Sequence, residues 1–355
     1  MTVSMPRARA VFMLHRASSA GLMAAWLVGF GPGCGAQTAA PFTLHAYANL
    51  MQFPVLVLNS DREPLAGIDG RRLQVSLDGG EFFSPRNVRR EGDDPIDLAI
   101  VLDVKNTEPS LVNGFAKALA DASGSLQPQD RISIYALGCN LLMSADAIPP
   151  DAERLHTTVE NALQSPALRT CEHPVHLREG LAVVAEHLGR ETGRRVLLAV
   201  TDGSDPGGRM DEEGLREFAD HDAVAIFELV EEEKVDELQG PAPFILPASS
   251  RFELICEDTG GMLISASAET ITARLRKFVA LLRGRYIVEF PRPQKMQKGA
   301  HQITVKLRGD PAAFVRATGL SVPLPDPRRL ADPTTIPSQA GANIPMGDKR
   351  PTSRE

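Results

Sequence analysis

Residues 97–107 read Asp-Leu-Ala-Ile-Val-Leu-Asp-Val-Lys-Asn-Thr, an apolar run that ends in a polar turn. A buried strand of a parallel sheet has this pattern, because helices cover both faces and the alternation of polar and apolar residues disappears. Residues 195–201 repeat the pattern and end in Asp202-Gly203. Ligands bind at the carboxyl ends of such strands, so we expect Asp103 and Asp202 to share one edge of a sheet. The alternative for each Asp is a helix cap or a turn.

Strand and helix patterns alternate on both sides of these two runs. Apolar residues spaced three or four apart predict helices, and continuous apolar runs predict further strands. This order predicts a mostly parallel, doubly wound α/β sheet with right-handed crossovers. The predicted helices lie at 111–119, 155–163, 177–188, 215–218 and 271–282, and the further strands at 132–137 and 223–227.

Short strand patterns with one polar face occur before and after this core. Two lie at 53–58 and 73–77, and three follow at 286–290, 303–307 and 314–322. Isolated hairpins are only marginally stable. We therefore expect the two sets to pair in one small β-domain into which the α/β domain is inserted.

The predicted organisation has five parts, with the charged stretch 86–94 as the link into the main domain. The final part is rich in Pro, Asp, Ser and Arg with little to bury, which is typical of disorder. The parts are a signal peptide at 1–33, an N-terminal β segment at 34–94, the α/β domain at 95–284, the closing β strands at 285–322 and a disordered tail at 323–355.

The N-terminus has the features of a secretory signal. Three arginines and no acid accompany an apolar run at 17–30 that is too short to span a bilayer. This pattern predicts export to the periplasm or outer envelope. Small residues ahead of Cys34 favour a lipid-anchored lipoprotein, whereas cleavage after Ala36 gives a secreted protein, and both readings stay open. A start-site artefact or a retained membrane anchor is a third alternative.

The strand that ends at Asp103, the Thr-Asp-Gly at 201–203 and the Gly-Gly at 260–261 resemble a known family. It is the von Willebrand factor type A domain, and more narrowly the bacterial VWFA-related domain proteins with extra flanking segments. The resemblance covers residues 50 to 322 or so. It implies a metal-ion-dependent adhesion site at the top of the sheet, built from Asp-x-Ser-x-Ser, a Thr from a later loop and the Asp of Thr-Asp-Gly.

Carried over by position, the metal ligands are Asp103, Thr107, Thr170 and Asp202, and the implied cofactor is Mg²⁺ or another divalent cation. Lys105 departs from the family, because it stands where the first Ser belongs. An ammonium beside two carboxylates repels a cation and competes for the same anions. Either Lys105 takes the place of the ion beside Asp103 or Asp202, or it turns outward and leaves a degenerate, weakened site.

The resemblance implies an exported, non-enzymatic protein-interaction module that grips an acidic side chain of a partner protein. If Lys105 has replaced the ion, its ammonium meets that carboxylate directly and is the ligand-binding group. The alternative is a metal-free structural or scaffold component of the cell envelope.

Other function classes find little support. The chain has no Gly-x-Ser-x-Gly, Walker or His-Glu-x-x-His motif. His173 and His176 are the best candidate bases of a hydrolase, but surface histidines are more often bystanders. A net charge of -7 and 5% aromatic residues argue against nucleic acid. A membrane is expected as a partner only through a lipid anchor.

Three cysteines follow the signal, at Cys139, Cys171 and Cys256. In an oxidising compartment the simplest expectation is one disulfide and one buried thiol. Cys139 and Cys171 both fall near the predicted ligand-binding edge, so their pairing would hold the Thr170 loop beside Asp103. Three buried, unpaired cysteines are the alternative. Their spacing does not match a zinc site.

Overall fold

The structure is a computed structural model. None of the helices it describes is both long and apolar enough to cross a membrane. The predicted signal peptide and Cys34 lie outside the described residues, which are 45–46, 50–232, 248–294, 296, 299–322, 335–336 and 342–347.

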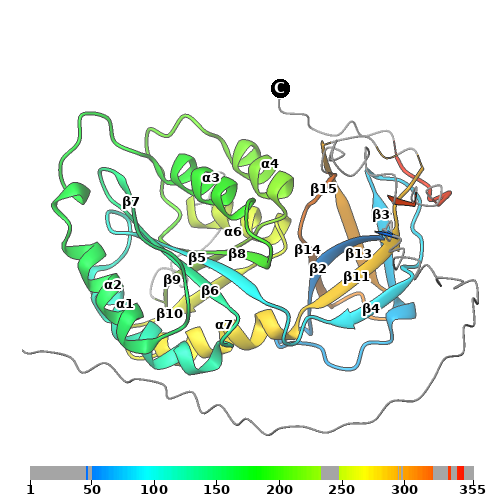
Figure 1. Cartoon of the computed structure of the whole chain (residues 1–355), viewed down its shortest axis with the longest axis horizontal. Coiled ribbons are helices and arrows are strands. Elements are labelled where there is room, and N and C mark those ends of the chain that lie inside the picture. Colours follow the sequence, from blue (N-terminus) through cyan, green and yellow to red (C-terminus); the bar gives the residue numbers. More distant parts are fainter. Residues whose placement is uncertain are drawn as a thin grey trace, which may run out of the picture. The chain divides into compact units, whose positions relative to one another are not determined.

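A six-stranded sheet forms the centre of the α/β domain (Figure 1). Its strands run parallel except for the antiparallel edge strand β7. The strand order places β5, which ends at Asp103, in the middle beside β8, so both carboxyl ends meet at one edge. In sheet order the strands are β10 (Leu263–Ala266), β9 (Ala225–Glu231), β8 (Arg194–Val200), β5 (Ile96–Asp103), β6 (Arg131–Leu137) and β7 (Leu141–Ile148).

Helices cover both faces of this sheet, as the apolar runs predicted (Figure 1). Leu98, Ile100 and Leu102 of β5 pack into one apolar core, and Ala99 and Val101 into the other. The doubly wound α/β architecture is therefore confirmed. The first core is closed by α1 (Pro109–Ala122), α2 (Ala152–Gln164) and α7 (Ile271–Gly284), and the second by α3 (Leu177–Leu188), α4 (Glu212–Asp222) and α6 (Ala248–Asp258).

The flanking strands pair with one another, which confirms that the α/β domain is inserted in a small β-domain. A four-stranded sheet has the order β14-β2-β11-β4, and β13 pairs with β3, so each sheet combines strands from before and after the insertion. Two further pairs are β12 with β15 and β1 with β16. The bounds are β1 (His45–Ala46), β2 (Leu50–Leu58), β3 (Leu73–Leu77), β4 (Asn87–Arg90), β11 (Tyr286–Pro291), β12 (Gly299–His301), β13 (Ile303–Leu307), β14 (Phe314–Ala317), β15 (Leu320–Val322) and β16 (Thr335–Ile336).

Two stretches differ from the sequence expectation. The charged link 86–94 contains β4, which pairs with β11 and packs Val88 against the β-domain core. Within the expected disordered tail, residues 342–347 lie against the β-domain. Ile344 and Met346 supply apolar side chains to its core, and Gly347 N donates to Leu77 O at 3.1 Å.

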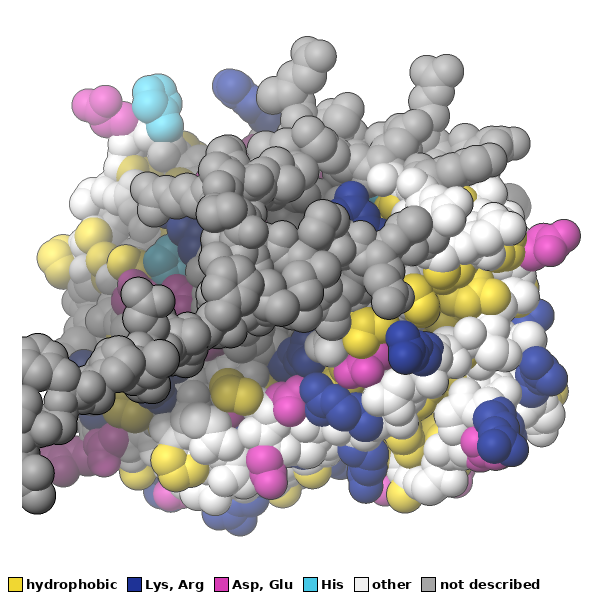
Figure 2. All heavy atoms as spheres, turned by 45° about the vertical axis from the view of Figure 1, so that its right-hand side comes forward, with side chains coloured by type: hydrophobic (Ala, Val, Ile, Leu, Met, Phe, Trp, Pro, Cys, Tyr) yellow, Lys and Arg dark blue, Asp and Glu magenta, His cyan; other side chains and the backbone are white. Residues whose placement is uncertain are grey.

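Exposed hydrophobic side chains lie beside Lys and Arg side chains on the face drawn in Figure 2. In the β-domain, cations cover two aromatic rings. The Lys306 ammonium lies 3.7 Å from the centre of the Phe82 ring, and the guanidiniums of Arg62 and Arg316 lie 4.1 and 4.6 Å from that of Phe314. Such contacts are worth about 0.5–1 kcal/mol each at exposed sites, so they stabilise the exposed Phe82 ring and the buried Phe314 ring.

The chain crosses between the two domains twice, and the two connecting segments are hydrogen-bonded to each other. Glu91 N donates to Arg285 O at 2.9 Å, and their side chains form a two-pronged ion pair with both N–O distances at 2.7 Å. Both side chains are almost completely buried, at 0% and 1% exposed. We call this ion pair the junction pair.

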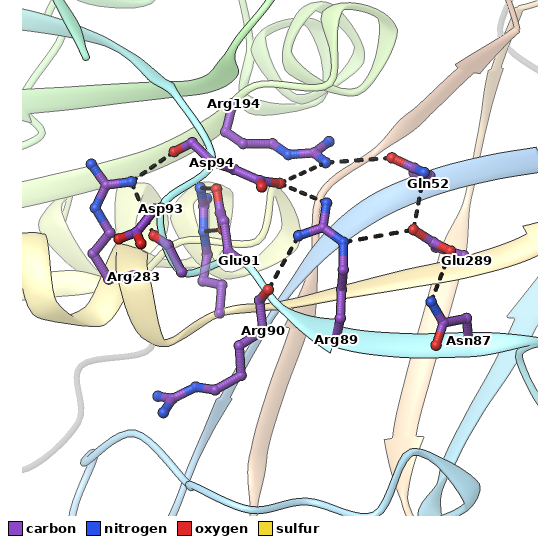
Figure 3. Close-up of polar contacts among 12 residues, drawn as sticks. Gln52, Asn87, Arg89, Arg90, Glu91, Asp93, Asp94, Arg194, Arg283 and Glu289 are labelled. Atoms are coloured by element: carbon purple, nitrogen blue, oxygen red, sulfur yellow. Dashed lines mark hydrogen bonds and ion pairs between the residues drawn. The ribbon is translucent and has the colours of Figure 1, made fainter. Parts of the chain in front are cut away.

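Further polar contacts lie beside Glu91 of the junction pair (Figure 3). The Asp94 carboxylate accepts from Arg89 at 2.7 Å and from Arg194 at 3.2 Å. Arg283 donates to the Asp94 carbonyl at 2.7 Å and pairs with Asp130. These contacts join β4, β8 and α7, so the orientation of the two passages is fixed by charged groups as well as by backbone bonds.

Candidate functional site

Asp103 ends β5 and is the hub of the candidate site. Its side chain is 1% exposed, and both of its oxygens accept hydrogen bonds. Oδ1 accepts from the backbone N–H groups of Lys105 and Asn106 at 3.2 and 3.3 Å. Oδ2 accepts from Asn106 Nδ2 at 2.9 Å and Thr201 Oγ1 at 3.0 Å. Burial raises the pKa of Asp103, and these hydrogen bonds oppose that rise.

Asn106 fills the space in front of Asp103. Its side-chain amide donates both to Asp103 Oδ2 and to the Ser204 carbonyl, at 2.9 and 3.0 Å. Its backbone carbonyl accepts from Asp202 N at 3.0 Å. The amide therefore ties the turn after β5 to the turn after β8. Sequence reasoning missed this residue, because it stands at a variable position of the family motif.

The structure brings three of the four predicted ligands to this edge but does not assemble a ligand set. Thr107 Oγ1 donates to Val200 O at 2.8 Å, and Asp202 Oδ1 accepts from Ser204 N at 2.9 Å. Thr170 is exposed, and within the described ranges no hydrogen bond joins it to Asp103 or Asp202. The role of Thr170 as a ligand therefore stays a prediction.

A disulfide and an asparagine side chain hold the loop that carries Thr170. Cys139 and Cys171 form a disulfide with a Cα–Cα distance of 5.6 Å, and Cys256 is a buried free thiol. Asn140 Nδ2 donates to the carbonyls of Ala167 and Thr170. The disulfide and these hydrogen bonds hold the Thr170 loop against the segment that follows β6.

The two candidate histidines lie just before α3, and His176 is its N-cap residue. His173 is exposed, and His176 lies 3.5 Å from Asp205. The Asp205 carboxylate accepts from the backbone N–H groups of Leu177 and Arg178, both at 3.0 Å. Asp205 thus caps the first turn of α3, where a negative charge is favourable, and His176 lies against that cap.

Glu228 lies buried under the same edge, on β9. It is 0% exposed, and among the described residues neither carboxyl oxygen has a hydrogen-bond partner. Burial raises its pKa strongly, and the charges of Glu253 and Asp202 add to this rise. Burial therefore favours the neutral acid of Glu228 more than water does. The sequence signal for this residue is a single Glu inside the apolar run of β9, and the sequence analysis did not identify it.

The donor set at Asp103 does not fit a divalent cation. A carboxylate offers about four lone-pair positions, and four N–H or O–H donors already occupy them. Amide hydrogens directed into the site repel a cation, whereas Mg²⁺ and Ca²⁺ need oxygen ligands. In the described part of the chain no cluster of three His, Cys, Asp or Glu side chains is arranged to hold a metal.

Lys105 turns outward. Its side chain is exposed, and its ammonium forms no ion pair with any described residue. Of the two outcomes that the sequence left open, the outward orientation is the one observed. The place in front of Asp103 belongs to Asn106 rather than to the lysine.

Replacing Asn106 with alanine is expected to lower the free energy of unfolding by about 2 kcal/mol, because a hydrogen bond to a buried carboxylate is lost together with one to a carbonyl. Urea unfolding measures this change. Asn161→Ala, on the exposed side of α2, is the matched control and should change stability little. Equal effects of the two substitutions would contradict the role of Asn106.

The sheet order, the antiparallel edge strand and the Asp at the end of the central strand define a von Willebrand factor type A-like α/β domain. No family model matches the chain, and no curated protein matches it.

Solved structures resemble this chain at low identity. BatB from Bacteroides thetaiotaomicron is 14% identical over 52% of this chain and 98% of its own, with a TM-score of 0.38. A von Willebrand factor type A protein from Catenulispora acidiphila is 10% identical over 77% and 72%, with a TM-score of 0.41. Proximal thread matrix protein 1 from the mussel byssus, with a zinc-occupied metal-ion-dependent adhesion site, is 10% identical over 61% and 50%, with a TM-score of 0.41.

Proposed function

We propose that this chain is an exported, non-enzymatic protein-interaction module. It uses the edge of the sheet around Asp103, and it binds an acidic side chain of its partner through Lys105 without a metal ion. The saturated carboxylate of Asp103, with Lys105 directed outward beside it, is the observation that carries this proposal.

The local geometry suits an exposed cation. The Lys105 backbone N–H is bonded to Asp103 Oδ1, and the next residue is bonded to both neighbouring turns. The backbone under the lysine is therefore held in place, so binding orders only its side chain. An ammonium that is paired with no described carboxylate is available for a partner carboxylate, which steers association and fixes orientation.

The same geometry argues against catalysis at this edge. Asp103 accepts hydrogen bonds at every lone-pair position, and it has no free position from which to accept a proton from a substrate. His176 is engaged with the Asp205 cap. We therefore assign a binding role to this edge.

Carbodiimide cross-linking tests the proposal, because it joins an amine to a contacting carboxylate. We expect the purified chain, incubated with envelope proteins in a chelator, to form an adduct in which the Lys105 ammonium is amide-linked to Asp or Glu of a partner. Mass spectrometry of the cross-linked peptides identifies both residues. Lys105→Arg keeps the charge and the complex but removes the amine, so the complex should persist without this adduct.

Lys117→Arg is the matched control, since Lys117 is 77% exposed on α1 and pairs with Asp121. This variant should leave the adduct unchanged. A complex that survives Lys105→Glu would contradict the proposal and favour a structural component of the envelope. A complex that the chelator abolishes would contradict the metal-free mode of binding.

A further inference from the structure

One face of the β-domain carries a cluster of cations. Arg308 N donates to Arg72 O at 2.8 Å, and in the register of β13 with β3 the neighbouring outward pair is Lys306 with Gln74. Successive side chains of a strand point to opposite faces, and the intervening residues of both strands fill the β-domain core. The side chains of these four residues therefore share the outer face of the two strands. We call Arg72, Lys306 and Arg308 the basic cluster.

Neutral groups hold each cation of the basic cluster in place. Arg72 Nε donates to Arg308 O at 3.0 Å. The Gln74 amide, oriented so that both of its ends have partners, accepts from Arg308 Nε and Nη2 at 3.3 and 3.0 Å. The Lys306 ammonium lies 3.7 Å from the centre of the Phe82 ring. These contacts position the three charges without neutralising them.

No acid offsets these charges in the part of the chain that the structure describes. The basic cluster forms no ion pair there, and this holds for Asp69 and Asp310, the acids closest to it in sequence. Arg72 and Arg308 lie directly opposite each other, an arrangement that destabilises a sheet when the charges are alike. The whole chain has a net charge of -7, so the positive excess is local. A bound anion would relieve this repulsion.

An exposed aromatic ring beside the basic cluster indicates which kind of anion fits. Phe82 is 38% exposed although it is in contact with Lys306. Apolar side chains next to Lys and Arg are typical of surfaces that lie at a membrane interface, where the ring enters the headgroup layer and the cations reach the phosphates. An acidic protein would use the cations but would not need the ring. The combination therefore favours a lipid surface.

We propose that the basic cluster and Phe82 dock this face of the β-domain on an anionic phospholipid surface. The guanidiniums of Arg72 and Arg308 match the geometry of lipid phosphates, and the Lys306 ammonium adds a third charge. The Phe82 ring enters the headgroup layer between them. This surface is separate from the Asp103 edge, and it does not depend on Lys105.

Tryptophan fluorescence of the full chain tests the contact at the site itself. The chain has one tryptophan, Trp26, so Trp26→Phe/Phe82→Trp has its single tryptophan beside the basic cluster. Vesicles of brominated phosphatidylglycerol should quench this tryptophan, and vesicles of brominated phosphatidylcholine should not. Trp26→Phe/Met143→Trp is the matched control, because Met143 is 49% exposed on β7 of the α/β domain. Its tryptophan should not be quenched by either lipid.

Neutralising the basic cluster should weaken the contact. With Arg72→Gln/Lys306→Gln/Arg308→Gln added to Trp26→Phe/Phe82→Trp, half-maximal quenching should require about a hundredfold more phosphatidylglycerol. This is about fivefold per cation, which corresponds to about 1 kcal/mol for each Lys or Arg near an anionic membrane surface. Raising the salt concentration should weaken quenching in the parent chain more than in the neutralised one.

Arg154→Gln/Arg169→Gln/Arg209→Gln removes the same charge from exposed positions of the α/β domain and should leave quenching unchanged, as should Lys105→Glu at the other site. Equal losses in the two triple variants, or equal quenching by the two lipids, would overturn the proposal. So would the absence of quenching by either lipid. A response of the tryptophan at position 82 to a capped poly-glutamate peptide but not to vesicles would replace the lipid with an acidic protein.

Discussion

Arg285→Met is expected to destabilise the folded chain by about 3–5 kcal/mol, because it leaves the buried Glu91 charge without its partner. The two side chains are bonded at two points and are 1% and 0% exposed, so water does not compensate for the loss. Among the substitutions considered for this protein it has the largest expected effect. The midpoint and slope of urea unfolding measure it.

The double variant Arg285→Met/Glu91→Leu distinguishes an unpaired charge from a loss of packing. Replacing both partners of a buried ion pair with apolar residues is often neutral or stabilising, so the double variant should recover most of the stability. Arg190→Met is the control, because its pair with Glu186 is 73% and 58% exposed. A loss below about 1 kcal/mol in Arg285→Met, the value typical of surface pairs, would refute the role of the junction pair.

Asp220 is expected to make the protein less stable as the pH rises from 3.8 to about 7. Burial, together with the charges of Asp258, Glu213 and Glu217, raises its pKa from 3.8 to about 7, against the attraction of Arg216. Because the folded chain holds this proton more tightly than the unfolded chain, the free energy of unfolding contributed by Asp220 is fully present below pH 3.8. It is lost as the pH rises to about 7, by on the order of 3 kcal/mol.

The Asp220→Asn variant cannot titrate at this position. Between pH 4 and pH 8 its free energy of unfolding should therefore fall by about 3 kcal/mol less than that of the native chain. Chemical unfolding at several pH values gives this difference. Asp121→Asn, at a partly exposed position on α1, should run parallel to the native chain. If the unfolding free energy of Asp220→Asn has the same pH dependence as that of the native chain, the Asp220 carboxyl is not titrating in this range.

The sequence was most informative where burial is continuous. The runs before Asp103 and Asp202 are apolar at nearly every position, and both became central strands of the sheet because helices cover both faces. The small β-domain was predicted for a related reason. Strands with one polar face need a partner, and β2 found β11 across the insertion.

The sequence was least informative where a residue works through its position in a turn. Asn106 looks like any turn residue, and only the meeting of two turns gives its amide two acceptors. The pattern of a family likewise does not report that a disulfide and Asn140 hold the loop of Thr170. Stretch 86–94 reads as a charged link, although its arginines line a strand and the junction network.

The double passage between the domains has a consequence for folding during synthesis. Strand β4 ends at Arg90 and its partner β11 begins at Tyr286, so almost the whole α/β domain is made between them. At a synthesis rate of 5–20 residues per second, the early strands wait roughly 10–40 s for their partners. Their edges stay open to other chains in that interval. The α/β domain must close first, and by bringing its own two ends together it shortens the loop that the later strands have to close.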